Sequence, residues 1–171
     1  MPSRGLHTSA SSLQRRPILA MLFGIAFLIF MYQKKKIFSP DSGNAIFTVL
    51  KSYGISNELS AWMTAQAAFE TADFNSFIFR DNNNAYGMKY AGQAIATGEK
   101  NGYANYKSVT DSAADLVAWY KRHRSNIFSL PLAINSLSDY VKFLKNQSYF
   151  EDSEAVYLAG VEYYYNKYFH D

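Results

Sequence analysis

Cysteine is absent from the chain, and charged residues are scarce. Without cysteine there are no disulfide bonds and no thiolate metal ligands, which leaves the redox compartment open. Charged residues make up 18% of the 171 residues and leave a net charge of +3, with no basic stripe interleaved with aromatic side chains. Nucleic-acid binding is therefore not expected, although a weak positive balance suits an anionic wall or membrane surface. No second His, Asp or Glu stands at ligand spacing from His123, so neither a metal site nor a cofactor is predicted.

Aromatic residues are abundant instead. They form 17% of the chain, with 14 Tyr and 13 Phe against 2 Trp. A tyrosine ring offers an apolar face with a hydroxyl group, which suits sugar rings, but buried helix packing is the more common use of such residues. With 49% hydrophobic residues, the chain has material for one modest domain and an appendage.

The N-terminal part predicts a membrane anchor. Residues 1–16 are polar and predict a flexible tail, and residues 17–33 form an apolar segment with arginines before it and lysines after it. The 16 uncharged residues 17–32 fall short of the roughly 20 that a spanning helix prefers, but basic side chains at both ends compensate. The alternative, a cleaved signal peptide, predicts small residues at the end of the run, which are missing here. Three basic residues on each side leave the orientation open.

Residues 34–42 predict a linker and residues 43–171 one helical domain. Its first helix is expected to start near Ser42 and to stop at Gly54, which is well placed as a C-terminal cap. The residues predicted to be buried by this helix are Ile46, Phe47, Val49, Leu50 and Tyr53.

The rest of the domain alternates helical patterns with turn signals. Ser56 or Asn57 is expected to cap a helix that ends at Glu70. The further elements expected are a loop over 73–84, a hairpin turning at Asn101 and Gly102, a helix from a Ser108 to Asp111 capping box, a helix over 131–146, and a helix after Ser153. The predicted fold class is mainly α.

Glu70 lies inside the apolar stripe of its helix when the residues are placed at 100° intervals. The other members of the stripe are Trp62, Met63, Gln66 and Phe69. An ionised carboxylate there loses solvation unless it is paired, so the pattern predicts either a raised pKa or a cleft at the end of the helix. Either outcome suits a general acid. The alternative is a solvated glutamate paired with Arg80 or Lys89.

Two stretches around this acid carry a resemblance to a known family. The run QAAFET (Gln66–Thr71) with Ser76, followed by NAYGMK (Asn84–Lys89), resembles the bacterial and phage glucosaminidase family of peptidoglycan hydrolases. This family, of mannosyl-glycoprotein endo-β-N-acetylglucosaminidase type, includes the flagellar muralytic enzyme and belongs to the lysozyme-like superfamily. The resemblance covers about residues 42–168 and implies a lysozyme-like α domain with a small, rudimentary β-lobe. The Gly-Leu-Met-Gln type motif usual in lytic transglycosylases is missing.

The resemblance also implies roles for particular residues. Glu70 would be the general acid in hydrolysis of the β-1,4 bond between N-acetylglucosamine and N-acetylmuramic acid. Glu99 would be a second catalytic carboxylate, although one residue is missing before the Asn-Gly pair, and a solvated turn glutamate is the alternative. Residues implied in substrate binding are Gln66, Asn84, Tyr86, Gly87, Met88 and Tyr157. If Glu99 is the partner, its exchange for Gln should reduce turnover more than Tyr157→Phe; if the substrate's own N-acetyl group is the nucleophile, the order reverses.

Together with the apolar segment over 17–33, the resemblance implies a membrane-anchored hydrolase of peptidoglycan glycan strands. The catalytic domain would lie on the wall side of a bacterial envelope or in a membrane-containing phage virion. Three alternatives stay open: a lytic transglycosylase, an inactive wall-binding or scaffold protein on the same fold, and a membrane protein whose helical domain binds another protein. An exposed apolar patch would favour the last, and a polar, aromatic cleft the enzyme.

Overall fold

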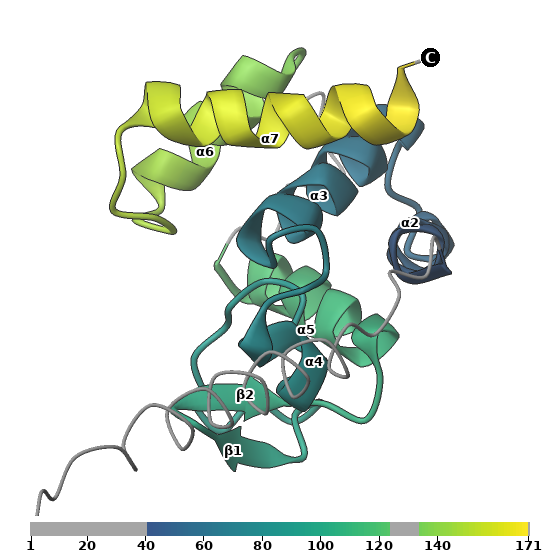
Figure 1. Ribbon diagram of the computed structural model, residues 1–171, viewed down its shortest axis with the longest axis vertical. Helices are drawn as coiled ribbons and strands as arrows, with labels where there is room; N and C mark the ends of the chain where they lie inside the picture. The colour runs from purple at the N-terminus through teal and green to yellow at the C-terminus, as the bar shows by residue number, and fades with distance from the viewer. Residues whose placement is uncertain (1–40, 124–133, 171) are drawn as a thin grey trace, which may run out of the picture. The chain divides into compact units, whose positions relative to one another are not determined.

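The computed structural model describes residues 41–123 and 134–170. The tail predicted over 1–16, the anchor over 17–33 and nearly all of the linker over 34–42 lie outside this part. Within it, no helix combines the length and the apolar character needed to cross a bilayer. The described elements, labelled in Figure 1, are α2 (Asp41–Ser52), α3 (Asn57–Glu70), α4 (Phe77–Asn82), β1 (Gly98–Lys100), β2 (Tyr103–Asn105), α5 (Val109–His123), α6 (Leu137–Asn146) and α7 (Glu154–Phe169). The protein is mainly α-helical, as predicted.

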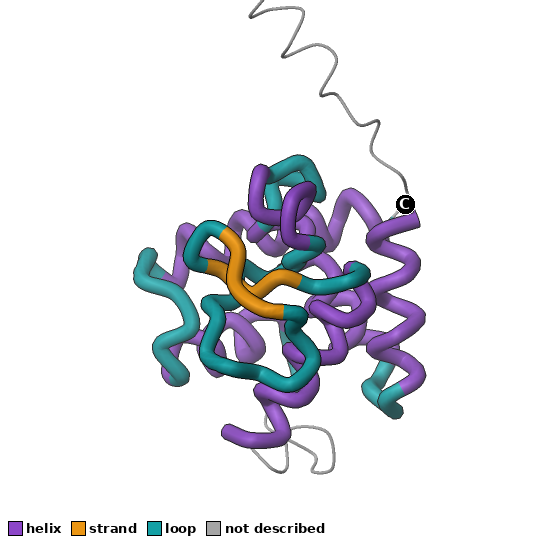
Figure 2. Tube along the Cα trace, turned by 90° about the horizontal axis from the view of Figure 1, so that it is seen from below, coloured by secondary structure: helices purple, strands orange, loops and turns teal. Residues whose placement is uncertain are grey.

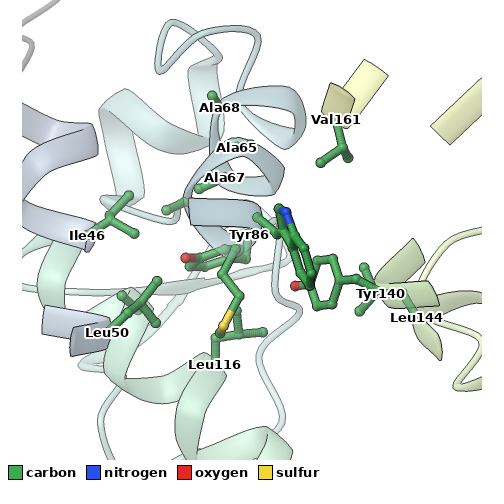
Figure 3. Packing of buried hydrophobic residues seen from close by; sticks show 14 of the residues in the cluster. Ile46, Leu50, Ala65, Ala67, Ala68, Tyr86, Leu116, Tyr140, Leu144 and Val161 are labelled. Atoms are coloured by element: carbon green, nitrogen blue, oxygen red, sulfur yellow. The ribbon is translucent and has the colours of Figure 1, made fainter. Parts of the chain in front are cut away.

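Helix α3 forms the centre of the domain. It packs against α2 and α7, and every residue from 60 to 68 is buried. In Figure 3 the alanines of α3 lie between Ile46 and Leu50 on one side and Tyr140 and Val161 on the other. Residues 60–68 are enclosed on all sides, so the polar residues Ser60, Thr64 and Gln66 are buried there together with the apolar ones. The apolar stripe inferred around Glu70 is therefore not the only buried face of the helix. The position of the acid at the end of α3 therefore matters more than its angle on the helix.

Both ends of α3 are fixed by hydrogen bonds between residues close in sequence. The Ser56 hydroxyl accepts a hydrogen bond from the Leu59 amide, which confirms the predicted cap. At the other end, Thr71 donates to the Ala67 carbonyl at 2.6 Å and accepts from the Phe74 amide at 2.9 Å. Residues 72–74 all have positive φ, and these bonds hold the chain in that left-handed turn.

The segment after this turn differs from the prediction. A continuous loop was expected over residues 73–84, but α4 lies within it, capped by the Ser76 hydroxyl. Six residues are fewer than two helical turns, too few for an apolar period to show in the sequence. Asn83, with φ of 51°, ends the helix in the left-handed region.

The predicted hairpin is present. Strands β1 and β2 pair antiparallel, and both turn residues, Asn101 and Gly102, have positive φ, as a tight two-residue hairpin turn requires. Figure 2 shows the two strands beside long loop segments. The Asn82 side chain donates to the Lys100 carbonyl, and an isolated bridge joins Lys89 to Tyr103. These bonds attach the hairpin to the loop that follows α4.

The remaining boundaries confirm most predictions. Ser108 and Asp111 exchange amide-to-side-chain hydrogen bonds as a capping box at the start of α5, and α7 starts after its Ser153 cap. Helix α6 begins only after Ser136, later than predicted. Tyr53, predicted to be buried, is 41% exposed because it follows the last residue of α2, and its ring lies near the Lys121 ammonium.

Candidate active site

Glu70, the last residue of α3, lines a cavity of about 1050 Å³. The walls of the cavity come from the end of α3, the start of α4, the loop over 84–94, strand β2, the end of α5, the segment between α6 and α7, and the start of α7. These segments are far apart in sequence, so the cavity exists only in the folded domain. It combines aromatic side chains with a few charged ones, the usual composition of a ligand site.

The Glu70 carboxyl is largely enclosed and makes one strong hydrogen bond. Tyr157, near the start of α7, donates its hydroxyl proton to Glu70 Oε1 at 2.5 Å. Burial raises the pKa of Glu70 above its ordinary value, and the Tyr157 hydrogen bond, which lowers it, is the smaller effect. No lysine or arginine within residues 41–123 and 134–170 forms a salt bridge with Glu70. The predicted rise in the pKa of Glu70 is thus confirmed. Within the described residues, Glu70 forms a salt bridge with neither Arg80 nor Lys89.

Two aromatic rings hold Tyr157 in place. Phe150 stacks on it with ring centroids 3.8 Å apart, and Phe69 meets it edge to face at 5.1 Å. Burial, followed by the charge of Glu70, raises the pKa of Tyr157 far above its ordinary range. Its hydroxyl therefore stays protonated at all physiological pH values and serves as a permanent donor to Glu70.

The loop that faces Glu70 is built by Asn84 and Gly87. The Asn84 amide nitrogen donates to the carbonyls of Met88 and Ala104, while its oxygen accepts from the amides of Tyr86 and Met88. The side chain is fully buried, and its polar atoms are engaged in shaping the loop. Gly87 has φ of 61°, and a Cβ added there would lie 4.0 Å from Glu70 Oε2. This glycine supplies the left-handed turn that brings the loop beside the acid.

Two further residues implied in substrate binding, Tyr86 and Gln66, are buried. The Tyr86 side chain is only 2% exposed and belongs to the hydrophobic core, while its carbonyl accepts from the Tyr149 hydroxyl. Gln66 is fully buried, does not line the cavity, and accepts a 2.5 Å hydrogen bond from Tyr140. Gln66 is therefore not placed to meet a sugar directly, whereas Tyr86 lines the cavity but is almost completely buried. Met88, by contrast, is partly exposed and lines the cavity.

Glu99 is not brought together with Glu70. It lies exposed on β1, is not among the cavity-lining residues, and accepts a hydrogen bond from the Gly102 amide at 3.1 Å. This is the arrangement of the alternative left open by the sequence, a solvated glutamate that stabilises its own turn. The missing residue before the Asn-Gly pair shortens this turn relative to the family pattern.

Several cavity residues carried no assigned role in the sequence. The aromatic wall includes Trp119, Tyr149 and Phe150, and the charged residues other than Glu70 are Lys89, Arg122 and Asp152. The packing of these aromatic residues becomes visible only in the fold: Phe150 stacks on Tyr157, and Tyr149 meets the Trp119 ring edge to face. In the described part of the chain, no group of three or more His, Asp or Glu side chains could hold a metal ion.

Comparison of the chain with protein-family models, curated proteins and solved structures gives no match. A functional assignment therefore depends on the geometry of this cavity and on the motifs around Glu70.

Proposed function

We propose that the protein is a peptidoglycan hydrolase that cleaves the β-1,4 bond between N-acetylglucosamine and N-acetylmuramic acid, with Glu70 as general acid. The observation that carries the proposal is the state of Glu70. Burial raises the pKa of this acid, it forms no salt bridge within residues 41–123 and 134–170, and it faces a cavity large enough for sugar rings. A carboxyl whose pKa is raised keeps its proton to a higher pH than an ordinary carboxyl and can donate that proton to a leaving oxygen. The choice of peptidoglycan as the substrate is supported by the Gln66–Thr71 and Asn84–Lys89 motifs, which resemble those of the glucosaminidase family.

In this mechanism the substrate supplies its own nucleophile. Glu70 donates its proton to the glycosidic oxygen as the bond from that oxygen to C1 breaks, and the acetamido oxygen of N-acetylglucosamine bonds to C1. Water then attacks C1, the bond to the acetamido oxygen breaks, and the proton from water returns to Glu70. This route is preferred because Glu99 lies outside the cavity, and it needs no second carboxylate. Tyr157 keeps the Glu70 carboxyl oriented toward the leaving oxygen.

The N-terminal segment completes the proposal. Residues 17–33, which lie outside the described part of the chain, would anchor the protein in a membrane with the domain on the wall side. Such an anchor confines the enzyme to glycan strands close to the bilayer. The proposed setting is a bacterial envelope or the membrane of a phage virion.

Glu70→Gln tests the proposal on purified peptidoglycan. Loss of a general acid is expected to lower turnover by a factor of about 10² to 10⁴, measured by zymography and by release of soluble fragments. Glu58→Gln, an exposed position in the first turn of α3, is the matched control and should keep full activity. Wild-type activity in Glu70→Gln would refute the role of Glu70.

One observation favours a second candidate, a wall-binding protein without activity. Only one of the two expected catalytic carboxylates, Glu70, lines the cavity. Product analysis separates the candidates: the hydrolase releases fragments with N-acetylglucosamine reducing ends, a lytic transglycosylase releases 1,6-anhydromuramic ends, and a binding protein releases neither. Mass spectrometry of borohydride-reduced digests distinguishes all three outcomes.

A further inference from the structure

Two cations line the cavity. They are Lys89 and Arg122, and the acidic lining residues are Glu70 and Asp152. Arg122 has the Asp115 carboxylate behind it, at 3.8 Å, whereas no salt bridge of Lys89 is formed within residues 41–123 and 134–170. When Glu70 is protonated as a general acid, the cavity lining therefore offers cationic donors to an anionic group of a substrate.

Arg122 is held by a buried acid. Its guanidinium lies 3.8 Å from Asp115 Oδ1, and the Asp115 side chain is 1% exposed, whereas that of Arg122 is 52% exposed. Asp115 Oδ2 accepts a 2.7 Å hydrogen bond from Tyr106, but Oδ1 has no hydrogen-bond partner within the described residues. A buried carboxylate requires a compensating charge, which explains the tether. The 3.8 Å separation is longer than a hydrogen bond, so Asp115 orients the guanidinium without occupying its donors.

Lys89 is held by contacts of its own. Its ammonium lies 3.5 Å from the centre of the Tyr103 ring, and its carbonyl accepts from the Gln93 side-chain amide. The neighbouring residue, Met88, has its sulfur 3.8 Å from the Tyr106 hydroxyl that donates to Asp115. Both cations are thus positioned by residues close to the cavity that they line.

We propose that Arg122 and Lys89 form an anion subsite that binds a carboxylate of the substrate. A guanidinium matches a carboxylate with two parallel N–H donors, and the ammonium adds a point charge. This inference depends on the proposed function, and it narrows the substrate to glycans that carry acidic substituents, as opposed to neutral N-acetylglucosamine polymers. In peptidoglycan, the carboxylate is either that of the lactyl ether or one on the attached peptide. Asp115 is a positioning residue, since it acts through Arg122.

The test measures binding by the full-length chain with Glu70→Gln, so that ligands are not consumed. The probes are a disaccharide of N-acetylglucosamine and N-acetylmuramic acid with a free lactyl carboxylate, the same disaccharide carrying a dipeptide, and neutral di-N-acetylchitobiose. Arg122→Gln and Lys89→Gln are each expected to weaken binding of at least one acidic probe about tenfold and to leave the neutral probe unchanged. Lys121→Gln, which removes a cation from the same helix outside the cavity, should change nothing.

The two acidic probes identify the source of the carboxylate. If the substitutions weaken binding of the lactyl probe alone, the bound carboxylate is that of the lactyl group. If they weaken binding of the dipeptide probe alone, it is a carboxylate of the peptide. If they weaken binding of both probes, the subsite accepts either carboxylate. Asp115→Asn should weaken the same probe as Arg122→Gln, and the effect should shrink in high salt. Arg122→Lys should recover part of the affinity, which a merely structural role would not require.

The proposal is overturned if Arg122→Gln leaves every probe unchanged, or if it weakens the neutral probe as much as the acidic ones. These failures differ from failure of the proposed function. A wild-type chain that degrades peptidoglycan while Arg122→Gln binds normally refutes only the subsite. A chain that binds acidic probes through Arg122 but releases no fragments keeps the subsite and refutes the hydrolase.

Discussion

The protonation of the Glu70 carboxyl affects the stability of the domain. Burial raises its folded-state pKa above the ordinary 4.5, so the folded state binds this proton more tightly than the unfolded chain. Between the unfolded and folded pKa values the folded state holds more protons, and stability falls as the pH rises through that window. Well below pH 4.5 the carboxyl is protonated in both states, so the destabilisation caused by its buried charge is absent and stability is highest with respect to this group.

Glu70→Gln is therefore expected to unfold at a higher temperature than wild type at pH 7, because it removes a buried charge while keeping an acceptor for Tyr157. The difference in Tm should shrink toward zero as the pH is lowered to 4, as measured by calorimetry. A Tm difference that is constant with pH would show that Glu70 does not carry the raised pKa. Glu58→Gln serves again as the exposed control.

Tyr157→Phe changes the pKa of Glu70 by removing its hydrogen-bond donor. The Tyr157 hydrogen bond lowers the Glu70 pKa, so its loss should raise that pKa further. The alkaline limb of the kcat/KM profile, where the general acid deprotonates, should then move to higher pH. Tyr163→Phe, on the exposed face of α7, should leave the profile unchanged.

Glu99→Gln is expected to leave turnover close to normal, because Glu99 lies outside the cavity and caps its own turn. This expectation reverses the order implied by the family pattern, in which Glu99 is the catalytic partner. Steady-state rates on purified peptidoglycan measure it directly. A large loss in Glu99→Gln, combined with normal turnover in Tyr157→Phe, would restore Glu99 as the partner.

At the scale of elements, the contact between α3 and α7 sets the position of the acid and its donor. Gly160, in the middle of α7, lies against Phe69, and a Cβ there would come within 2.2 Å of the Phe69 ring. Phe69 in turn contacts the Tyr157 ring at its edge. A glycine inside a helix is normally unfavourable, and here the close approach of the two helices explains it.

Gly160→Ala is expected to destabilise the domain by about 1 to 3 kcal/mol, because the added methyl forces α7 away from α3. Activity should fall with it, since Tyr157 moves with α7. Gly43→Ala in α2 is the matched control: its Cβ would meet neighbours only at 3.8 Å, so helix propensity should stabilise the fold by about 0.4 to 1 kcal/mol. Urea unfolding of both variants measures the contrast in sign, and equal effects would contradict the packing argument.

For the whole molecule, the decisive question is on which side of a membrane the domain lies. Charge counting around residues 17–33 does not settle the orientation, but peptidoglycan is accessible only outside the cytoplasm. We therefore expect the domain from residue 39 onward to be digested by protease added to intact spheroplasts of an expressing bacterium. Protection of the domain under these conditions, with digestion after lysis, would contradict the cellular form of the proposal.

Features encoded locally could be read from the sequence. The Ser56 and Ser108 caps, the Asn101-Gly102 turn and the mainly helical class were all predicted correctly. Each depends on residues within a few positions of one another, so the side chain and the backbone group that it satisfies are visible together in the sequence. Glu70 was singled out for the same reason, since its motif and its place at a helix end are local.

The tertiary structure decided which side chains surround that acid. Tyr157 lies 87 residues from Glu70, and Tyr149 lies 63 residues from the Tyr86 carbonyl that it contacts. Such pairs form only when α7 and the segment before it pack against α3 and the 84–88 loop. Burial of Asn84 and Gln66, exposure of Glu99 and the tether of Arg122 to Asp115 likewise depend on that packing. The sequence by itself determined the mainly helical class, the helix caps and the hairpin turn, and it singled out Glu70; it did not show the short helix α4. Tertiary packing determined the pKa of Glu70, its hydrogen-bond donor and its cavity, because burial and long-range contacts arise only when distant segments meet.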